Sequence, residues 1–251
     1  MEDSEESQAE QPKGDEAAAP TKARERKVLV IDVGGTHVKL LATSERTPLK
    51  IDSGPTLTPQ RMAAAVKKAV KEAGWSYDAV AIGYPGPVHR GRPLLEPHNL
   101  GRGWRRFDFH AAFGAPVRIV NDAGMQALGS YSGGRMLFLG LGTGLGTAIV
   151  SDGVLDSLEL AHLPYRRGKT FEDYVGLRGL RRLGKKKWRA HVTKVVALLS
   201  AALKADYVVL GGGNSKLLKK LPPNAKLGRN SNAFLGGFRL WKGTGSKHLG
   251  E

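Results

Sequence analysis

The chain has 251 residues, with 39 Lys or Arg against 23 Asp or Glu, a formal net charge of +16 and no cysteine. Its length and 41% hydrophobic residues allow a buried core, so a wholly disordered protein is excluded. The lack of cysteine excludes disulfides, thiolate metal sites and a cysteine nucleophile. No apolar run is long enough to span a bilayer, and the charge favours an anionic partner without identifying it.

The charge is unevenly distributed along the chain. Residues 1–26 hold eight acids and four bases, a net charge of −4, so the remainder carries +20. This segment is rich in Ala, Glu, Gln and Pro, and we expect it to be a disordered acidic tail. It has neither the apolar stretch of a signal peptide nor the basic character of a transit peptide, so we expect a cytoplasmic protein that does not contact membranes.

The densest basic stretch runs from Arg166 to Arg189 and includes Lys185, Lys186 and Lys187. It is either a set of solvated helix faces or a docking track for a polyanion. Nucleic acid is a weaker candidate partner, because modules that stack bases usually place aromatic residues among the bases, and aromatic residues are only 7% of this chain.

The first half of the chain predicts a β-hairpin, a helix, a strand and a loop. Two apolar runs flank Gly34-Gly35, which is typical of a hairpin. Thr58 can cap the start of the helix and Gly74 its end. The expected ranges are 27–33 and 36–43 for the hairpin strands, 58–73 for the helix, 77–82 for the strand and 84–105 for the loop.

The second half repeats strand, glycine turn and strand. It adds a helix that opens at Asn121-Asp122, and a long helix whose apolar residues follow the i, i+3, i+4, i+7 pattern. The expected ranges are 117–120, 136–141, 148–150 and 207–210 for strands, and 121–131, 171–203 and 232–241 for helical segments. This order predicts a mixed α/β protein of two domains built from a duplicated unit.

The two glycine turns carry the first functional signal. Glycines allow backbone N–H groups to point at phosphate oxygens without interference from a Cβ atom. The alternative for each turn is a tight hairpin that binds nothing. Neither is a dinucleotide fingerprint, because Thr147 stands where the third glycine would be and a strand follows instead of a helix.

A second signal is Asp122, which follows a strand and starts a helix. It is either a plain N-cap or a general base that takes a proton from a hydroxyl group. Glu159 and His162 form a third candidate pair, which suits a weak metal site, polyol binding or ordinary loop polarity.

Six motifs in one order resemble the ROK family (repressor, open reading frame, kinase) of sugar kinases, and the resemblance covers roughly residues 27–241. In chain order they are Asp32-x-Gly34-Gly35-Thr36-x-x-Lys39, Gly83-Tyr84-Pro85-Gly86-Pro87-Val88, Asn99-Leu100-x-x-Gly103-Trp104, Asn121-Asp122-Ala123, Gly142-Thr143-Gly144-Leu145-Gly146 and Gly211-Gly212-Gly213. The resemblance implies a two-domain actin-like ATPase (ribonuclease H-like) fold, an α/β fold of duplicated β-hairpin/α units with an inter-domain cleft. We expect domains at 27–119, with the C-terminal helix of about 232–241 packed back on it, and at 120–231, followed by a frayed tail at 242–251.

The resemblance also implies roles for the motif residues, with Asp122 as the catalytic base. Phosphate groups would be held by Gly34, Gly35, Thr36, Lys39, Gly142, Thr143 and Gly144. The sugar would be held by Gly86, Asn99, Asn121, Asp122, Glu159 and His162, and a nucleotide or polyphosphate by Gly211, Gly212 and Gly213. Mg²⁺ would bridge donor oxygens, with Asp32 oriented toward its hydration shell.

Departures from the family pattern narrow the choice of subfamily that the chain resembles. Ala161 replaces a glycine of the sugar motif, and the missing cysteines rule out the zinc site of most members. Only about fifty residues separate His162 from Gly211, and this short spacing and Gly211-Gly212-Gly213-Asn214-Ser215-Lys216 resemble the bacterial polyphosphate glucokinases.

The implied function is phosphoryl transfer from polyphosphate or ATP to the 6-hydroxyl of glucose or a related hexose, by a homodimer that binds neither nucleic acid nor membranes. One alternative is an ATP-only glucokinase or mannokinase. Another is a catalytically degenerate sugar-binding protein or regulator, although we expect the acidic tail to be unable to supply the DNA-binding helices that the family's repressors carry.

Overall fold

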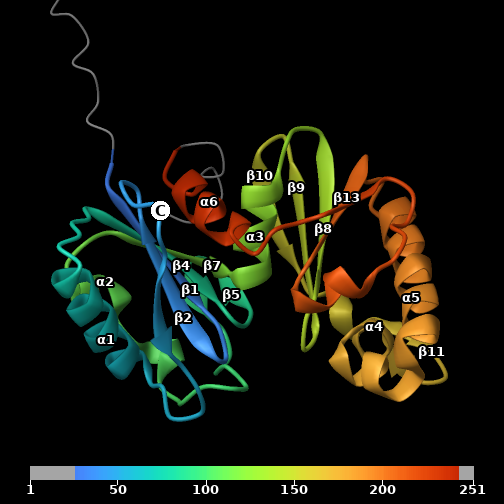
Figure 1. The fold of residues 1–251 in the computed structure, drawn as a ribbon, viewed down its shortest axis with the longest axis horizontal. Coiled ribbons are helices and arrows are strands. Elements are labelled where there is room, and N and C mark those ends of the chain that lie inside the picture. Colours follow the sequence, from blue (N-terminus) through green and yellow to red (C-terminus); the bar gives the residue numbers. More distant parts are fainter. Residues whose placement is uncertain (1–25, 243–251) are drawn as a thin grey trace, which may run out of the picture.

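The computed structural model describes residues 26–242, so nearly all of the expected acidic tail and of the expected frayed C-terminal tail lies outside the described residues. Two five-stranded sheets alternate with layers of helices (Figure 1). From left to right the layers are α1 and α2, the first sheet, α3 and α6, the second sheet, and α4 with α5. Within the described range, no helix has the length and apolar character needed to cross a membrane.

The first sheet has the strand order β3-β2-β1-β4-β7. Its strands are β1 (Val28–Val33), β2 (His37–Ala42), β3 (Leu49–Asp52), β4 (Ala79–Tyr84) and β7 (Val117–Asn121). β1 and β2 form the predicted antiparallel hairpin, in which Asp32 lies opposite Lys39, while β4 and β7 run parallel to β1. The predicted strand 77–82 is displaced toward the C-terminus, since β4 includes Gly83 and Tyr84.

The second sheet has the order β10-β9-β8-β13-β14 and repeats the topology of the first. Its strands are β8 (Arg135–Leu141), β9 (Leu145–Ser151), β10 (Val154–Leu158), β13 (Tyr207–Gly211) and β14 (Ala225–Leu227). Each sheet contains a three-stranded antiparallel meander followed by two parallel strands. The expectation of a duplicated unit is therefore confirmed.

The helices follow the predicted order, with one addition and one break. They are α1 (Pro59–Glu72), α2 (Phe109–Phe113), α3 (Asp122–Ser130), α4 (Phe171–Val175), α5 (Leu177–Ala202) and α6 (Asn232–Arg239). Thr58 caps α1 as predicted, by accepting a hydrogen bond from the Arg61 N–H. The short helix α2 was not predicted, and α5 is interrupted at Gly184, whose φ of 72° is non-helical.

Short elements fill the connections. They are the hairpins β5 (Val88–His89) with β6 (Arg92–Pro93) and β11 (Pro164–Arg166) with β12 (Lys169–Thr170), and the 3₁₀ turns η1 (Trp104–Arg106), η2 (Leu160–His162) and η3 (Gly213–Leu217). The predicted loop 84–105 thus contains a small hairpin, because Arg90-Gly91 can form a two-residue turn.

The central layer of α3 and α6 is packed unusually closely. A Cβ atom at Gly129 of α3 would lie 1.8 Å from the Asn232 carbonyl oxygen, and one at Gly236 of α6 would lie 1.8 Å from that of Met125. On its other side α6 meets β1, since a Cβ at Gly237 would lie 2.4 Å from Val30. Helix α6 therefore contacts both α3 and the first sheet, and the division into domains at residues 119 and 231 stays a prediction.

Candidate active site

The first glycine turn lies at the tip of β1 and β2. The Gly34 N–H donates to the His37 carbonyl oxygen at 3.0 Å, and the Ser53 hydroxyl donates to the Gly34 carbonyl at 2.7 Å. A Cβ at Gly35 would lie 3.4 Å from the Cβ of Asn99. The turn therefore adjoins the segment that the sequence predicts to contact sugar.

The second glycine turn joins β8 to β9 and contacts the loop that contains Gly211, Gly212 and Gly213. The Asn214 amide donates to the Gly142 carbonyl at 2.9 Å, and the Leu177 N–H donates to the Thr143 carbonyl at 3.1 Å. A Cβ at Gly212 would lie 2.4 Å from the Leu141 carbonyl oxygen, and its φ is 79°, so this position requires glycine. The structure thus brings Gly211–Gly213 and the start of α5 to the second turn.

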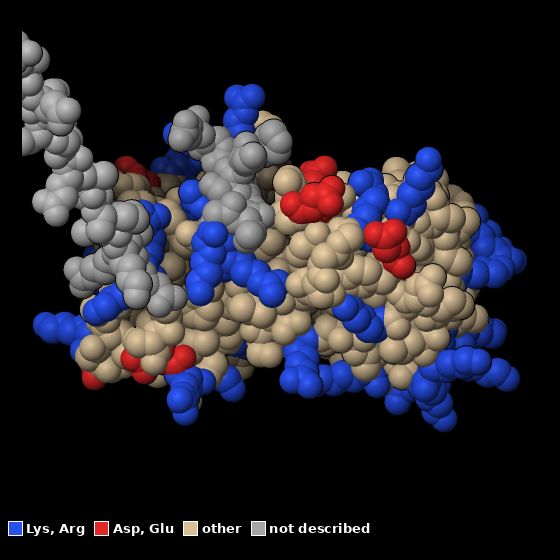
Figure 2. Space-filling model, turned by 90° about the horizontal axis from the view of Figure 1, so that it is seen from above, with Lys and Arg blue, Asp and Glu red and all other residues tan. Residues whose placement is uncertain are grey.

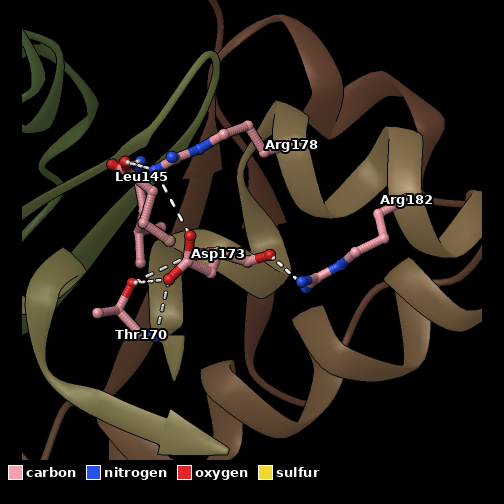
Figure 3. A network of polar contacts seen from close by, with 6 residues as sticks. Leu145, Thr170, Asp173, Arg178 and Arg182 are labelled. Carbon is pink, nitrogen blue, oxygen red and sulfur yellow. Dashed lines mark hydrogen bonds and ion pairs between the residues drawn. The ribbon is translucent and has the colours of Figure 1, made fainter. Parts of the chain in front are cut away.

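Glu172 also contacts this turn, and the sequence analysis assigned it no role. Its carboxylate accepts a hydrogen bond from the Leu145 N–H at 3.1 Å and forms an ion pair with Arg178 at 3.3 Å. Arg178 also pairs with Asp173 at 3.5 Å, and Asp173 forms a capping box with Thr170 (Figure 3). This network ties α4 and α5 to the second glycine turn, and the T-x-x-D spacing at 170–173 is its detectable signal.

Asn121, and not Asp122, is the N-cap of α3. Its side-chain oxygen accepts hydrogen bonds from the N–H groups of Ala123 at 2.9 Å and Gly124 at 3.3 Å, and its amide donates to the Gly86 carbonyl at 3.0 Å. The interpretation of Asp122 as a plain cap is therefore wrong. Asn121 ties the glycine loop after β4 to the start of α3, and Asp122 takes the next position on the helix.

The Asp122 carboxyl has an unusual proton affinity. Burial raises its pKa to about 7, the nearby charge of Asp32 contributes in the same direction, and Glu159 adds a smaller effect. A hydrogen bond from the Ala123 N–H opposes this rise. Because a pKa near neutrality suits both proton uptake and proton release at physiological pH, Asp122 can act as a general base.

Asp32 is the neighbouring carboxyl on β1. Burial raises its pKa, whereas Lys39, whose Nζ lies 3.6 Å from Oδ2 of Asp32, lowers it. Asp32 lies opposite Gly83 of β4, and a Cβ at Gly83 would lie 3.6 Å from the Cα of Asp122. The absence of a side chain at Gly83 thus allows α3 to start beside the carboxyl end of β1.

The remaining predicted sugar residues flank η2. Glu159 and His162 are exposed at its two ends, and Ala161 between them is only 4% exposed, within the core against α4 and α5. The methyl group that distinguishes Ala161 from glycine is therefore accommodated by packing and does not point into solvent.

The basic stretch lies on α4, α5 and the connections around them. Lys185, Lys186 and Lys187 are exposed immediately after the break at Gly184. Trp188 anchors the helix beneath them, because its indole N–H donates to the Val175 carbonyl at 2.8 Å and its ring is fully buried. Blue side chains gather along the lower right rim of Figure 2, at the end of the molecule that carries α5 in Figure 1.

A magnesium site built only from protein is absent from the described part of the chain, where no three His, Asp or Glu side chains gather to hold a metal ion. Mg²⁺ at phosphoryl-transfer sites is typically held by one or two carboxylates, waters and the phosphates themselves. A single carboxylate beside a glycine turn, such as Asp32, fits that arrangement.

Comparison with known proteins identifies the family. The sequence model of the ROK family matches residues 28–157. A polyphosphate glucokinase of Mycobacterium tuberculosis is 28% identical over 214 residues, covering 77% of this chain and 80% of the relative. An N-acetylmannosamine kinase of Citrobacter koseri is 34% identical over 141 residues, covering 51% of this chain and 48% of the relative.

Solved structures agree in fold. An inorganic polyphosphate/ATP-glucomannokinase from Arthrobacter sp. strain KM superposes with a TM-score of 0.72 at 23% identity, covering 85% of this chain and 97% of that one. A ROK family glucokinase from Streptomyces griseus, in complex with glucose and AMPPNP, gives a TM-score of 0.65 at 17% identity, with coverage of 85% and 98%.

The chain belongs to the ROK family, as its six motifs indicate, and it has the actin-like ATPase fold. Within that family it is a sugar kinase, and its relatives include kinases for more than one sugar.

We predict that Glu172 stabilises the fold through the second glycine turn. Glu172→Ala leaves the Leu145 N–H without its acceptor, and we expect it to lower the free energy of unfolding by about 1–3 kcal/mol. Glu172→Gln keeps an acceptor and loses only a half-exposed ion pair. Its free energy of unfolding should therefore fall by less than about 1 kcal/mol. Urea unfolding measures both.

The matched control is Glu72→Ala, which removes an exposed pair with Lys68 on α1. It should change stability by less than about 0.5 kcal/mol. Equal losses for Glu72→Ala and Glu172→Ala would contradict the structural role of Glu172.

Proposed function

We propose that this sugar kinase transfers the terminal phosphoryl group of inorganic polyphosphate, or of ATP, to the 6-hydroxyl of glucose or a related hexose. The observation that carries the proposal is the Asp122 carboxyl, with its pKa near 7, at the start of a helix held between two sheets that each present a glycine turn. A proton acceptor between two potential phosphate-binding turns suits phosphoryl transfer to a hydroxyl group.

In the proposed mechanism the sugar hydroxyl oxygen attacks the terminal phosphorus. Its O–H proton passes to the Asp122 carboxylate, a new P–O bond forms, and the bond to the leaving phosphate breaks. Asn121 supports this geometry, because it caps α3 and binds the Gly86 carbonyl at the same time. Asn99, Glu159 and His162 would hold the other sugar hydroxyls, and a site that binds each hydroxyl rejects analogues that lack one.

The phosphoryl donor would lie between the glycine turns. Backbone N–H groups at Gly34–Thr36 and Gly142–Gly144 would bind its phosphate oxygens, and Lys39, which is 35% exposed beside Asp32, would contribute a cation. Bound Mg²⁺ would neutralise charge on the donor oxygens, with Asp32 accepting hydrogen bonds from its water ligands.

Three features support polyphosphate as a donor: relatives named polyphosphate glucokinases, the net charge of the chain and the exposed lysines of α5. A kinase for another hexose stays the nearest alternative, because an N-acetylmannosamine kinase is also among the relatives. A degenerate sugar-binding protein is the second alternative. A homodimer in the cytoplasm, free of nucleic acid and zinc, stays a prediction.

We predict that Asp122→Asn abolishes turnover while sugar still binds. The amide keeps the size of the side chain but accepts no proton, so kcat should fall by about 10²–10⁴-fold with glucose, Mg²⁺ and either donor. Calorimetry of glucose binding tests whether the sugar site is retained. The control is Asp156→Asn, an exposed acid on β10 whose loss should leave kcat unchanged.

Retained turnover in Asp122→Asn would remove Asp122 from the proposed role. No phosphorylated product from the wild-type protein, with any hexose and either donor, would refute the kinase function itself.

We predict that the same Asp122→Asn variant is more stable than the wild type at pH 8. A carboxyl whose folded pKa is raised to about 7 destabilises the fold once pH exceeds its unfolded value, and the cost is fully expressed above the folded pKa. The gain should be about 1–3 kcal/mol at pH 8 and vanish near pH 4. Unfolding curves at the two pH values measure it, and a pH-independent difference would contradict the raised pKa.

We predict that the exposed lysines of α5 serve polyphosphate and not ATP. Replacing Lys185, Lys186 and Lys187 by Gln should raise the KM for polyphosphate roughly tenfold and weaken its salt dependence. The control replaces Lys67, Lys68 and Lys71 on α1 in the same way. Equal losses for polyphosphate and ATP would refute the docking track and leave the kinase proposal intact.

A further inference from the structure

A cavity of about 480 Å³ opens at the edge of the first sheet, and no residue of the proposed active site lines it. Its walls come from the hairpin β5–β6, the segment from η1 to the start of α2, and strand β7. Five arginines line it together with a single carboxylate, that of Asp108. The arginines are Arg90, Arg92, Arg105, Arg106 and Arg118.

Four of the arginines that line the cavity are exposed. They are Arg90, Arg92, Arg105 and Arg106, and none of the ion pairs between residues 26 and 242 includes one of them. Arg118 differs, since it donates to the Leu240 carbonyl and lies 4.4 Å from the centre of the Trp241 ring. Asp108 caps α2 by accepting from the Ala111 N–H at 2.9 Å, so it is already engaged.

The hairpin turn that carries Arg90 has a left-handed backbone. Arg90 has a φ of 47° and Gly91 a φ of 68°, which makes the hairpin turn one in which Asn-Gly is usually preferred. An arginine in this left-handed region costs about 1 kcal/mol. On the opposite wall, the rings of Phe107 and Phe109 pack edge to face at 4.8 Å beside Arg105 and Arg106.

We propose that this cavity is a second anion site, which binds a phosphorylated small molecule or the end of an oligophosphate. Guanidinium groups bind phosphoryl oxygens in bidentate fashion, and four exposed arginines that line one open cavity suit a compact anion with several negative charges. Arginine side chains from two opposed walls would close on a ligand that reaches into the cavity. A nucleic acid duplex is too wide to enter a space of this size.

The site is connected to the proposed sugar contacts through the chain. The hairpin β5–β6 begins two residues after Gly86, η1 begins five residues after Asn99, and β7 ends at Asn121. Each wall of the cavity thus continues into one predicted sugar-binding segment. Occupancy of the arginine cavity should therefore change the affinity for sugar, and by linkage sugar should change the affinity for the anion.

Calorimetric titration of the full chain tests the site, with tripolyphosphate and glucose 6-phosphate as separate probes. The variant Arg90→Asn/Arg106→Gln removes one cation from each wall, and asparagine tolerates the left-handed turn. Both probes also fit the proposed active site, so we expect the wild type to show a second binding event in addition to the one at that site. The variant should weaken this second event at least tenfold, while kcat with saturating glucose stays unchanged. The control is Lys67→Gln/Lys68→Gln on α1, which removes the same charge elsewhere.

The two probes distinguish the source of the anion. A loss in Arg90→Asn/Arg106→Gln confined to tripolyphosphate binding assigns the cavity to the donor type of molecule, and a loss confined to glucose 6-phosphate binding assigns it to the product type. Identical titrations for the wild type and Arg90→Asn/Arg106→Gln with both probes would overturn the proposal. If that variant does not fold, Arg92→Gln alone carries the same comparison. Failure of the kinase assay would leave this result untouched, because binding is measured without turnover.

Discussion

Helix α3 packs closely against both sheets and against α6, and the rest of the structure depends on this constraint. A Cβ at Gly83 of β4 would reach Met125 at 2.4 Å, and one at Gly146 of β9 would reach Ala123 at 2.7 Å. Both sheets therefore use a glycine to admit the first turn of α3, while Gly129 lets α6 pack on its last turn. The position of the Asp122 carboxyl is fixed by this packing, because the two glycines let the side chains of Met125 and Ala123 lie directly against the sheets.

This packing also explains the charge state of the carboxyl. Asp122 lies at the end of a helix wedged between two sheets, so burial is the main cause of its raised pKa and the charge of Asp32 the next. Lys39 compensates Asp32 across the hairpin and leaves Asp122 without a cation at comparable distance in the described contacts. Burial of the Asp122 carboxylate lowers the stability of the fold, and it also provides a proton acceptor whose pKa is close to neutral pH. Such a loss of stability in favour of activity is common at active sites.

The elements that the sequence predicts correctly are those whose bounds are set by residues close together in the chain. The β1–β2 hairpin follows from Gly34-Gly35, and the bounds of α1 follow from Thr58 and Gly74. Strands β3, β10 and β14 are short and partly polar, so they depend on pairing with neighbours that only the folded sheet supplies. The bond from Asn121 to the Gly86 carbonyl and the contact of Glu172 with the second glycine turn were missed for the same reason, because each requires a partner distant in sequence. The cap made by Asn121 is local, but Asn121 and Asp122 are equally good capping residues, so sequence alone does not choose between them.

The positive charge of the chain contributes to two proposed anion-binding surfaces, the lysines of α5 and the arginine cavity. The lysines after Gly184 are consecutive in sequence, so the sequence alone marks them as a candidate track. The four exposed arginines of the second anion site come from positions up to sixteen residues apart, Arg90 to Arg106, and only the pairing of β5 with β6 and the turn at η1 gather them around one space. A linear charge count finds the first and overlooks the second. The α5 lysines belong to a helix packed on the second sheet and the arginine cavity lies at the edge of the first, so a polyanion at the lysines and a compact phosphate in the cavity would bind to different layers of the fold.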